Sequence, residues 1–231
     1  MNRTKSKLAS IVLASSFAYQ TGCIAVTKLP KIDVEQCSTK YKDSRTRIGI
    51  EPLDTPNEVA YNTQIRPDRV LPRGVLPVYV EIENISDIEI TLHPNQSYLE
   101  DPTKNIWEAI SPQNFVHHVE FKGKENIGRQ ALSIICFMMS PLGAGVGSLI
   151  AETNIKRVCD NNEKKILYRD ITLPPSEEAR GLLIFQRKGL TGAFDYQGSK
   201  IFVPYSIKDE RFEAAISVGP KAENPYALRG E

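Results

Sequence analysis

The chain has 231 residues, of which 41% are hydrophobic and 25% charged. This is the composition of a folded protein, and the length suffices for a sizeable core in one large or two small domains. The formal net charge is +1, and no basic run with interleaved aromatic residues occurs. Nucleic acid is therefore excluded as an expected partner.

The first 22 residues have the layout of an export signal. Arg3, Lys5 and Lys7 form a basic beginning, an apolar centre runs from Leu8 to Ala18, and small and polar residues lead to Cys23. The apolar centre is too short to cross a membrane as a permanent anchor. We predict that residues 1–22 are a signal peptide.

The end of this segment carries a family resemblance. Thr21-Gly22-Cys23 resembles the lipobox of bacterial lipoproteins, in which two small residues precede the cysteine that receives the lipid. Gln20 departs from that pattern, since the family usually has Leu there. The resemblance implies lipidation of Cys23, so that the lipid (palmitate in part) makes the membrane a partner. Ile24 is unlike the Asp that retains such proteins in the inner membrane, which implies an outer-membrane anchor facing the periplasm.

Two alternatives stay open for the beginning of the chain. Ser16-Phe17-Ala18 also suits ordinary signal peptidase, which would give a secreted or soluble periplasmic protein. Residues 23–45 are polar and without a clear period, and they are predicted to be a lipidated tether. The other interpretation of their later part is an opening strand fastened through Cys37.

Alternating apolar residues predict that the body is built of short strands. The clearest pattern covers residues 78–83 and 88–92, two period-two runs across a four-residue turn, which predict an antiparallel hairpin with one buried and one solvated face. Residues 181–185 are continuously apolar and suit a central strand. Further strands are expected at residues 47–53, 115–121, 201–205 and 212–218, the last two as a pair.

Strands at this spacing predict a mainly β domain over residues 46–219, with a helical insert at about 126–165 and a polar tail at 220–231. The hairpin, with Pro174-Pro175-Ser176-Glu177-Glu178 leading into residues 181–185, loosely resembles immunoglobulin-like modules of bacterial envelope proteins. The resemblance implies an antiparallel immunoglobulin-like β-sandwich, into which the apolar helical hairpin is inserted.

The insert contains the most apolar stretch of the body. Residues 130–151 are 22 residues without a charge, and Pro141 followed by Gly143 and Gly147 predicts two helical arms with a break between them. Gly143 and Gly147 also form a small-residue face that another helix can approach closely. The hairpin packs on its own sheet, dips into the membrane, or makes an oligomer contact; the sequence leaves these three interpretations open.

No residue pattern indicates catalysis, a metal or a cofactor. His117 and His118, as neighbours on a predicted strand, point to opposite faces, with His117 expected in the core. Neither a zinc motif nor a GxSxG elbow occurs. Cys136 and Cys159 are candidates for a disulfide that pins the two helical arms together, and the alternative is that the cysteines are simply buried.

The sequence thus predicts a non-enzymatic envelope lipoprotein, a structural or interaction module with an envelope protein as its partner. The alternative is a membrane-inserting or oligomerising assembly component that uses residues 130–151. An enzyme of unfamiliar type is the third interpretation. It would be favoured by a histidine or Cys159 in an open cleft beside an acidic residue.

Overall fold

The computed structural model describes residues 29, 34–63, 65, 67–121, 156, 158–187, 189 and 195–219. The described chain is mainly antiparallel β, with ten strands joined in one sheet. The strands are β1 (Thr39–Lys42), β2 (Thr46–Pro52), β3 (Val75–Asn84), β4 (Ile90–Leu92), β5 (Tyr98–Glu100), β6 (Ile106–Ala109), β7 (Ile171–Leu173), β8 (Glu178–Gln186), β9 (Lys200–Ile207) and β10 (Glu210–Ser217). The predicted signal peptide, residues 130–151 and the predicted tail lie outside the described residues.

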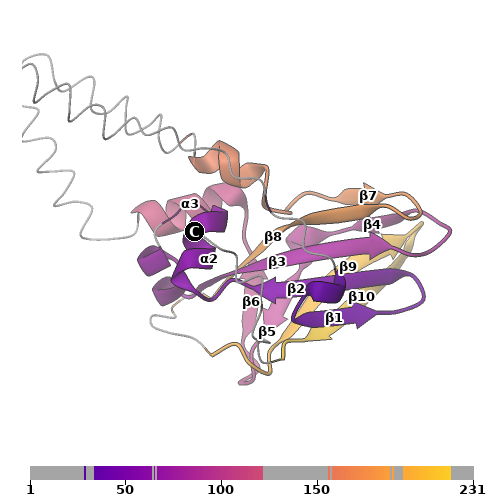
Figure 1. Cartoon of the computed structure of the whole chain (residues 1–231), viewed down its shortest axis with the longest axis horizontal. Helices are drawn as coiled ribbons and strands as arrows, with labels where there is room; N and C mark the ends of the chain where they lie inside the picture. Colours follow the sequence, from indigo (N-terminus) through magenta and orange to yellow (C-terminus); the bar gives the residue numbers. More distant parts are fainter. Residues whose placement is uncertain are drawn as a thin grey trace, which may run out of the picture.

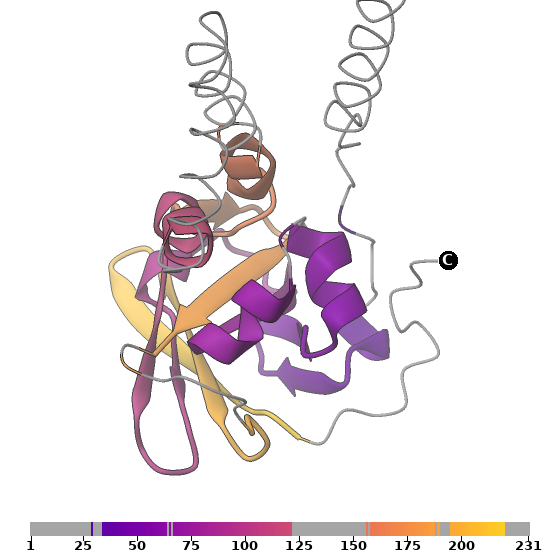
Figure 2. The same cartoon turned by 90° about the vertical axis from the view of Figure 1, so that its left-hand side faces the viewer.

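Short helices connect the strands. They are η1 (Val34–Gln36), α2 (Pro56–Thr63), η2 (Pro67–Arg69), η3 (Leu71–Arg73), η4 (Pro94–Gln96) and α3 (Pro112–Phe121), with helical residues also at 158–163. None of the described helices is both long and apolar enough to cross a membrane. In Figures 1 and 2, α2 and α3 gather at one end of the sheet.

The sheet curls so that its two ends face each other. Its order is β1-β2-β3-β8-β6-β5-β9-β4-β7, with β10 on the free edge of β9, and every strand pair is antiparallel. Ile48 and Val80 from one end share a buried cluster with Val203 and Ala214 from the other. Figure 1 shows the strands that carry these residues as two layers, one in front of the other.

A second core lies on the outer side of β3 and β8. Tyr79 and Leu182 of these strands pack with Val59 of α2 and Phe115 of α3. The face of β3 predicted to be solvated is therefore covered. Glu81, buried on this face, accepts a hydrogen bond from the Tyr79 hydroxyl at 2.9 Å, so that a polar pair replaces the expected water contact.

The predicted hairpin of residues 78–92 is wrong, although its alternation is right. β3 pairs with β2 and β8, whereas β4 pairs with β9 and β7, so the two strands lie in different layers. The reason lies at Asn84, whose Nδ2 donates to the carbonyls of Ile88 at 2.8 Å and Leu173 at 2.9 Å. These bonds hold residues 84–88 as a crossing between layers instead of a tight turn.

The strand predicted at residues 115–121 is a helix, α3. Phe115, Val116 and Val119 form its buried side, a helical spacing that a period-two interpretation cannot produce. Ser111 begins the helix, because its Oγ accepts from the Asn114 amide at 3.2 Å and Pro112 follows it at the first position. His117 is exposed, so the prediction of a core histidine is also wrong.

The beginning and end of the body differ in how well they were predicted. Thr39–Lys42, within the predicted tether, forms strand β1, as the alternative interpretation has it. Cys37 is buried against β2, where a Cβ on Gly49 would lie 2.6 Å from its sulfur. The central strand at residues 181–185 and the pair at 201–218 are confirmed as β8 and β9–β10.

Polar contacts fix the chain on both sides of residues 122–155. Before them, Nη1 of Arg73 donates to the carbonyl of Val119 at 2.7 Å. After them, Nδ2 of Asn162 donates to the Thr63 carbonyl at 3.0 Å, and Nζ of the buried Lys165 donates to the Asn62 carbonyl at 3.0 Å. Burial lowers the pKa of Lys165. Residues 158–163 lie beside α3 in both views (Figures 1 and 2).

The segment after this region presses on the middle of β8, which makes Gly181 a sensitive position. A Cβ on Gly181 would lie 2.4 Å from Cγ of Leu167 and 2.7 Å from the Lys165 carbonyl. We expect Gly181→Ala to lower the free energy of unfolding by about 1–3 kcal/mol through overpacking. Gly219→Ala, where a Cβ would meet nothing within 4 Å, is the control. Urea unfolding measures both, and equal stability of the two variants would contradict the packing.

Candidate functional site: a charged hollow on the outer sheet face

The edge of β9 opposite β10 is shared by two short strands, and a gap separates them. β5 pairs with β9 at Phe202, and β4 pairs with it from Tyr205. Between these ladders the chain makes the 3-10 turn η4, and the amide of His93 donates to the Pro204 carbonyl at 3.0 Å. Proline suits this place because its missing N–H has no strand to pair with.

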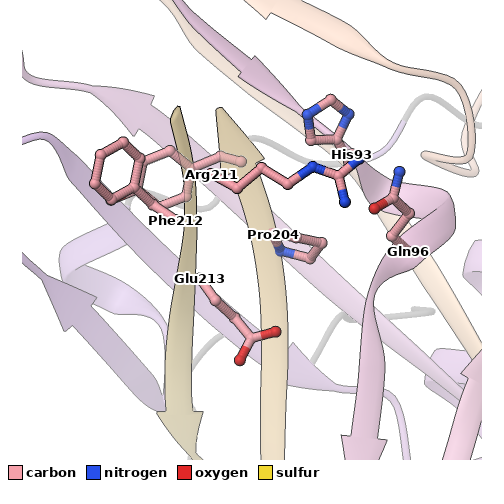
Figure 3. Close-up of a pocket in the computed structure, with 7 residues that line it drawn as sticks. His93, Gln96, Pro204, Arg211, Phe212 and Glu213 are labelled. Atoms are coloured by element: carbon pink, nitrogen blue, oxygen red, sulfur yellow. The ribbon is translucent and has the colours of Figure 1, made fainter. Parts of the chain in front are cut away.

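A hollow of about 340 Å³ opens over this gap. Figure 3 shows Pro204 between the side chains of η4 on one side and those of β10 on the other. Its lining residues are His93, Gln96, Pro204, Tyr205, Arg211, Phe212 and Glu213. Pro204 is short and rigid, while its neighbours are long, so the sheet surface is lowest at this point.

Two opposite charges flank Pro204. Arg211 faces Ser206 across the β9–β10 ladder and Glu213 faces Pro204, so both project from the outer face of β10. Both are exposed. In Figure 3 the guanidinium of Arg211 points toward His93 and Gln96, away from Glu213. Within the described part of the chain, the side chain of Arg211 has neither an ion pair nor a hydrogen bond.

The imidazole of His93 is fixed from both sides. Its Nε2 lies 3.0 Å from Oγ of Ser206. Its Nδ1 lies 3.1 Å from Oδ2 of Asp170, an ion-pair contact in which the atoms are not aligned for a hydrogen bond. The ring therefore keeps one orientation at the rim of the hollow, with little of it exposed.

Asp43 holds the layer beneath the hollow. Its Oδ1 accepts from the amides of Arg45 at 2.7 Å and Thr46 at 2.6 Å, and its Oδ2 accepts from the hydroxyl of Tyr205 at 2.8 Å. Burial and this last bond raise the pKa of Tyr205 to about 12. The Tyr205 ring stacks on Phe212 at 5.5 Å, and the Arg45 guanidinium lies 3.9 Å from the centre of the Phe212 ring.

An aromatic pair continues the outer surface along β9. The rings of Tyr98 and Phe202 stack with centroids 4.5 Å apart and planes 10° from parallel. The Tyr98 hydroxyl donates to Oε1 of Glu213 at 3.4 Å, which joins the pair to the hollow. Burial and the charge of Glu213 raise the pKa of Tyr98 above its ordinary value of 10.0. The outer face thus offers charge and apolar surface side by side.

The imidazole of His93 lies between a serine hydroxyl and a carboxylate, Ser206 and Asp170, as the histidine of a hydrolytic triad does. Other features that a serine hydrolase needs do not accompany this arrangement. Asp170 is 54% exposed and poorly aligned with the imidazole. Ser206 lies within β9, with Thr91 of β4 and Arg211 of β10 paired to it, so the ladders engage the backbone amides that an oxyanion hole needs. The contacts fix His93 without assembling a nucleophile.

Most residues singled out from the sequence lie elsewhere. Cys23, Cys136, Pro141, Gly143 and Gly147 are outside the described residues, so the lipid site, the disulfide and the membrane or oligomer contact stay predictions. Cys159 is half-buried beside α3, and burial with nearby acidic residues raises the pKa of its thiol. His118 lies 2.9 Å from Nε2 of Gln186 through its Nδ1. Within the described residues, no three His, Cys, Asp or Glu side chains could hold a metal ion.

Sequence reasoning missed the hollow. The inward alternation of Phe212, Ala214 and Ile216 already places Arg211 and Glu213 on the outer face of one strand. That signal was available. The approach of His93 and Gln96 to β10 could not be predicted, because it depends on β4 and β5 sharing one edge of β9. That long-range pairing leaves no local pattern in the sequence.

Comparisons with known proteins give no information about the function of the hollow. No protein-family model and no curated protein matches the chain. Among solved structures, the chain is similar to the crystal structure of the yjhA protein from Bacillus subtilis, at 12% identity and a TM-score of 0.33, over 72% of this chain and 77% of that one. A likeness at this level carries no argument about function.

The Asp43 cluster predicts how stability depends on pH. Burial alone would raise the pKa of Asp43, but the bonds from Thr46, Arg45 and Tyr205 outweigh it and hold the pKa below its ordinary 3.8. The carboxylate therefore stabilises the fold above that value, and this contribution is lost as pH falls through the lower folded pKa. We expect Asp43→Asn to cost about 1–3 kcal/mol at neutral pH and less in acid.

Urea unfolding at pH 7 and pH 3 measures this difference. Asp87→Asn, on an exposed loop, is the matched control and should change stability little at either pH. An equal cost of Asp43→Asn at both pH values would show that the charge of this carboxylate does not contribute.

A reactivity test separates the triad-like contacts from a working hydrolase. We expect no labelling of Ser206 by a fluorophosphonate, because the β-ladders on both sides of Ser206 engage the backbone amides that would have to stabilise the oxyanion. Hydrolysis of p-nitrophenyl acetate should be the same for the wild type and Ser206→Ala. Labelling that is lost in both Ser206→Ala and His93→Ala would identify an enzyme instead.

Proposed function

We propose that the protein is a non-enzymatic envelope lipoprotein that acts as an interaction module at the periplasmic side of the outer membrane. The lipid on Cys23 anchors it, and a tether that ends before η1 separates the folded body from the bilayer. The partner is an envelope component that contacts the outer face of β9 and β10.

The observation that carries the interaction part is the hollow beside Pro204. A surface arginine without a described partner, an opposed carboxylate and a half-buried aromatic pair meet there on a rigid sheet. Arginine and aromatic side chains are the residues most often responsible for binding energy at interfaces. The base of the hollow is fixed by Asp43 and by β-ladders, so a ligand would meet a surface that needs little reorganisation.

We also propose that the fold is an immunoglobulin-like β-sandwich with an inserted apolar helical hairpin. The two facing layers and the antiparallel pairing support an immunoglobulin-like sandwich, and Arg129 and Glu152 bound an uncharged stretch that fits an apolar helical hairpin. In this proposal the hairpin of residues 130–151 packs against the protein and is not a second anchor.

Fractionation of cells tests the anchor. We expect the full chain to sediment with membranes and to resist salt but not detergent, while Cys23→Ser is released to the soluble fraction, because lipid is the only attachment. Labelling with radioactive palmitate should mark the wild type but not Cys23→Ser. The control is Cys37→Ser, which removes a different cysteine and should stay with the membrane.

Two results would contradict the proposal. If Cys23→Ser stays in the membrane until detergent is added, residues 130–151 are themselves a membrane element and the assembly component takes first place. If the wild type is already soluble and unlabelled, the chain is secreted without lipid.

A further inference from the structure

We propose that the hollow binds a short zwitterionic peptide, with Arg211 holding its carboxylate and Glu213 its amine. This inference rests on the proposed function, because it names what the interaction module recognises. It is argued from three properties of the surface: the unpaired cation, the separated anion and the apolar floor between them.

The cationic end of the hollow, formed by Arg211, is suited to binding one carboxylate. The Arg211 guanidinium is planar and presents paired N–H donors that match the two oxygens of a carboxylate. It lies toward Gln96, whose amide adds a further donor, and toward His93, whose ring is already held by Ser206 and Asp170 (Figure 3). A carboxylate bound here would find donors on two sides.

The anionic end of the hollow is Glu213, which faces Pro204 across the β9–β10 ladder. Glu213 is two positions along β10 from Arg211, so their Cα atoms are about 7 Å apart. The carboxylate of Glu213 receives the Tyr98 hydroxyl at 3.4 Å, which leaves its other oxygen to accept from an ammonium group. A multiply charged anion such as a phosphate would be repelled by Glu213, whereas a ligand with both charges satisfies both side chains.

The size of the hollow limits the ligand. A volume of about 340 Å³ is at the lower end for small-molecule sites. An extended chain spans about 3.5 Å per residue, so a dipeptide covers about the 7 Å between the Cα atoms of Arg211 and Glu213. Because the Arg211 guanidinium points away from Glu213, the two charges lie farther apart than these Cα atoms, which suits a peptide of two or three residues. Its apolar side chain can rest on Pro204 and on the stacked rings of Tyr98 and Phe202.

Isothermal titration of the purified full-length chain in detergent with alanyl-phenylalanine tests the inference. We expect a Kd of about 1 mM or tighter. N-acetylation or C-terminal amidation of the peptide should each weaken binding about tenfold or more, because each removes one charge-assisted contact.

Two variants assign each charge. Arg211→Gln should bind the free and the amidated peptide equally, and Glu213→Gln should bind the free and the acetylated peptide equally. Lys208→Gln and Glu210→Gln, on the same hairpin but outside the hollow, should behave as the wild type. Circular dichroism melting confirms that each variant is folded, since all four side chains are exposed.

Absence of binding, or binding that ignores the peptide ends, would overturn the inference, as would equal discrimination in all variants. This failure is distinct from failure of the proposed function. If Cys23→Ser is released as expected and the peptide does not bind, the lipoprotein proposal is retained and the zwitterionic ligand is rejected. If the peptide binds a chain that carries no lipid, the binding site is retained and the lipid anchor is rejected.

Discussion

The outer face of this protein depends on how β9 is paired. One edge of the strand is fully used by β10, while the other passes from β5 to β4 with a turn of 3-10 helix between them. The outer surface is interrupted where the strand next to β9 changes from β5 to β4. Pro204 lies at this interruption, where no strand is available to pair with a backbone N–H. The hollow, its charged rim and the position of His93 all follow from that interruption.

The layer beneath makes the interruption rigid. Asp43 belongs to the turn between β1 and β2, yet it accepts a hydrogen bond from the hydroxyl of Tyr205 in β9, so one carboxylate joins the first two strands of the body to its last strand pair. The stacked Phe212 and the guanidinium of Arg45 close the same side. A recognition surface on a curled sheet keeps its shape only if the curl itself is fixed, and these contacts fix it.

Local patterns predicted the parts of the fold that local physics determines. The apolar run at residues 181–185 and the pair at 201–218 were predicted correctly, because burial on both faces and a short charged turn are visible in neighbouring residues. α3 was mistaken for a strand, since Phe115 and Val119, four residues apart, fit either period until Ser111 and Pro112 are recognised as a helix start. Strand pairing escaped prediction: residues 78–92 alternate as a hairpin does, but Asn84 sends the chain to the other layer.

The contacts that fix the chain on both sides of residues 122–155 bear on how the protein can change over evolution. Arg73 holds the end of α3, and Asn162 with Lys165 holds the chain where it returns, so the two attachment points are side by side and independent of what joins them. The entropy of closing a loop grows only slowly with its length. The contacts that hold the sheet on either side therefore do not depend on the number of residues between them, and a change in that number would cost the sheet little.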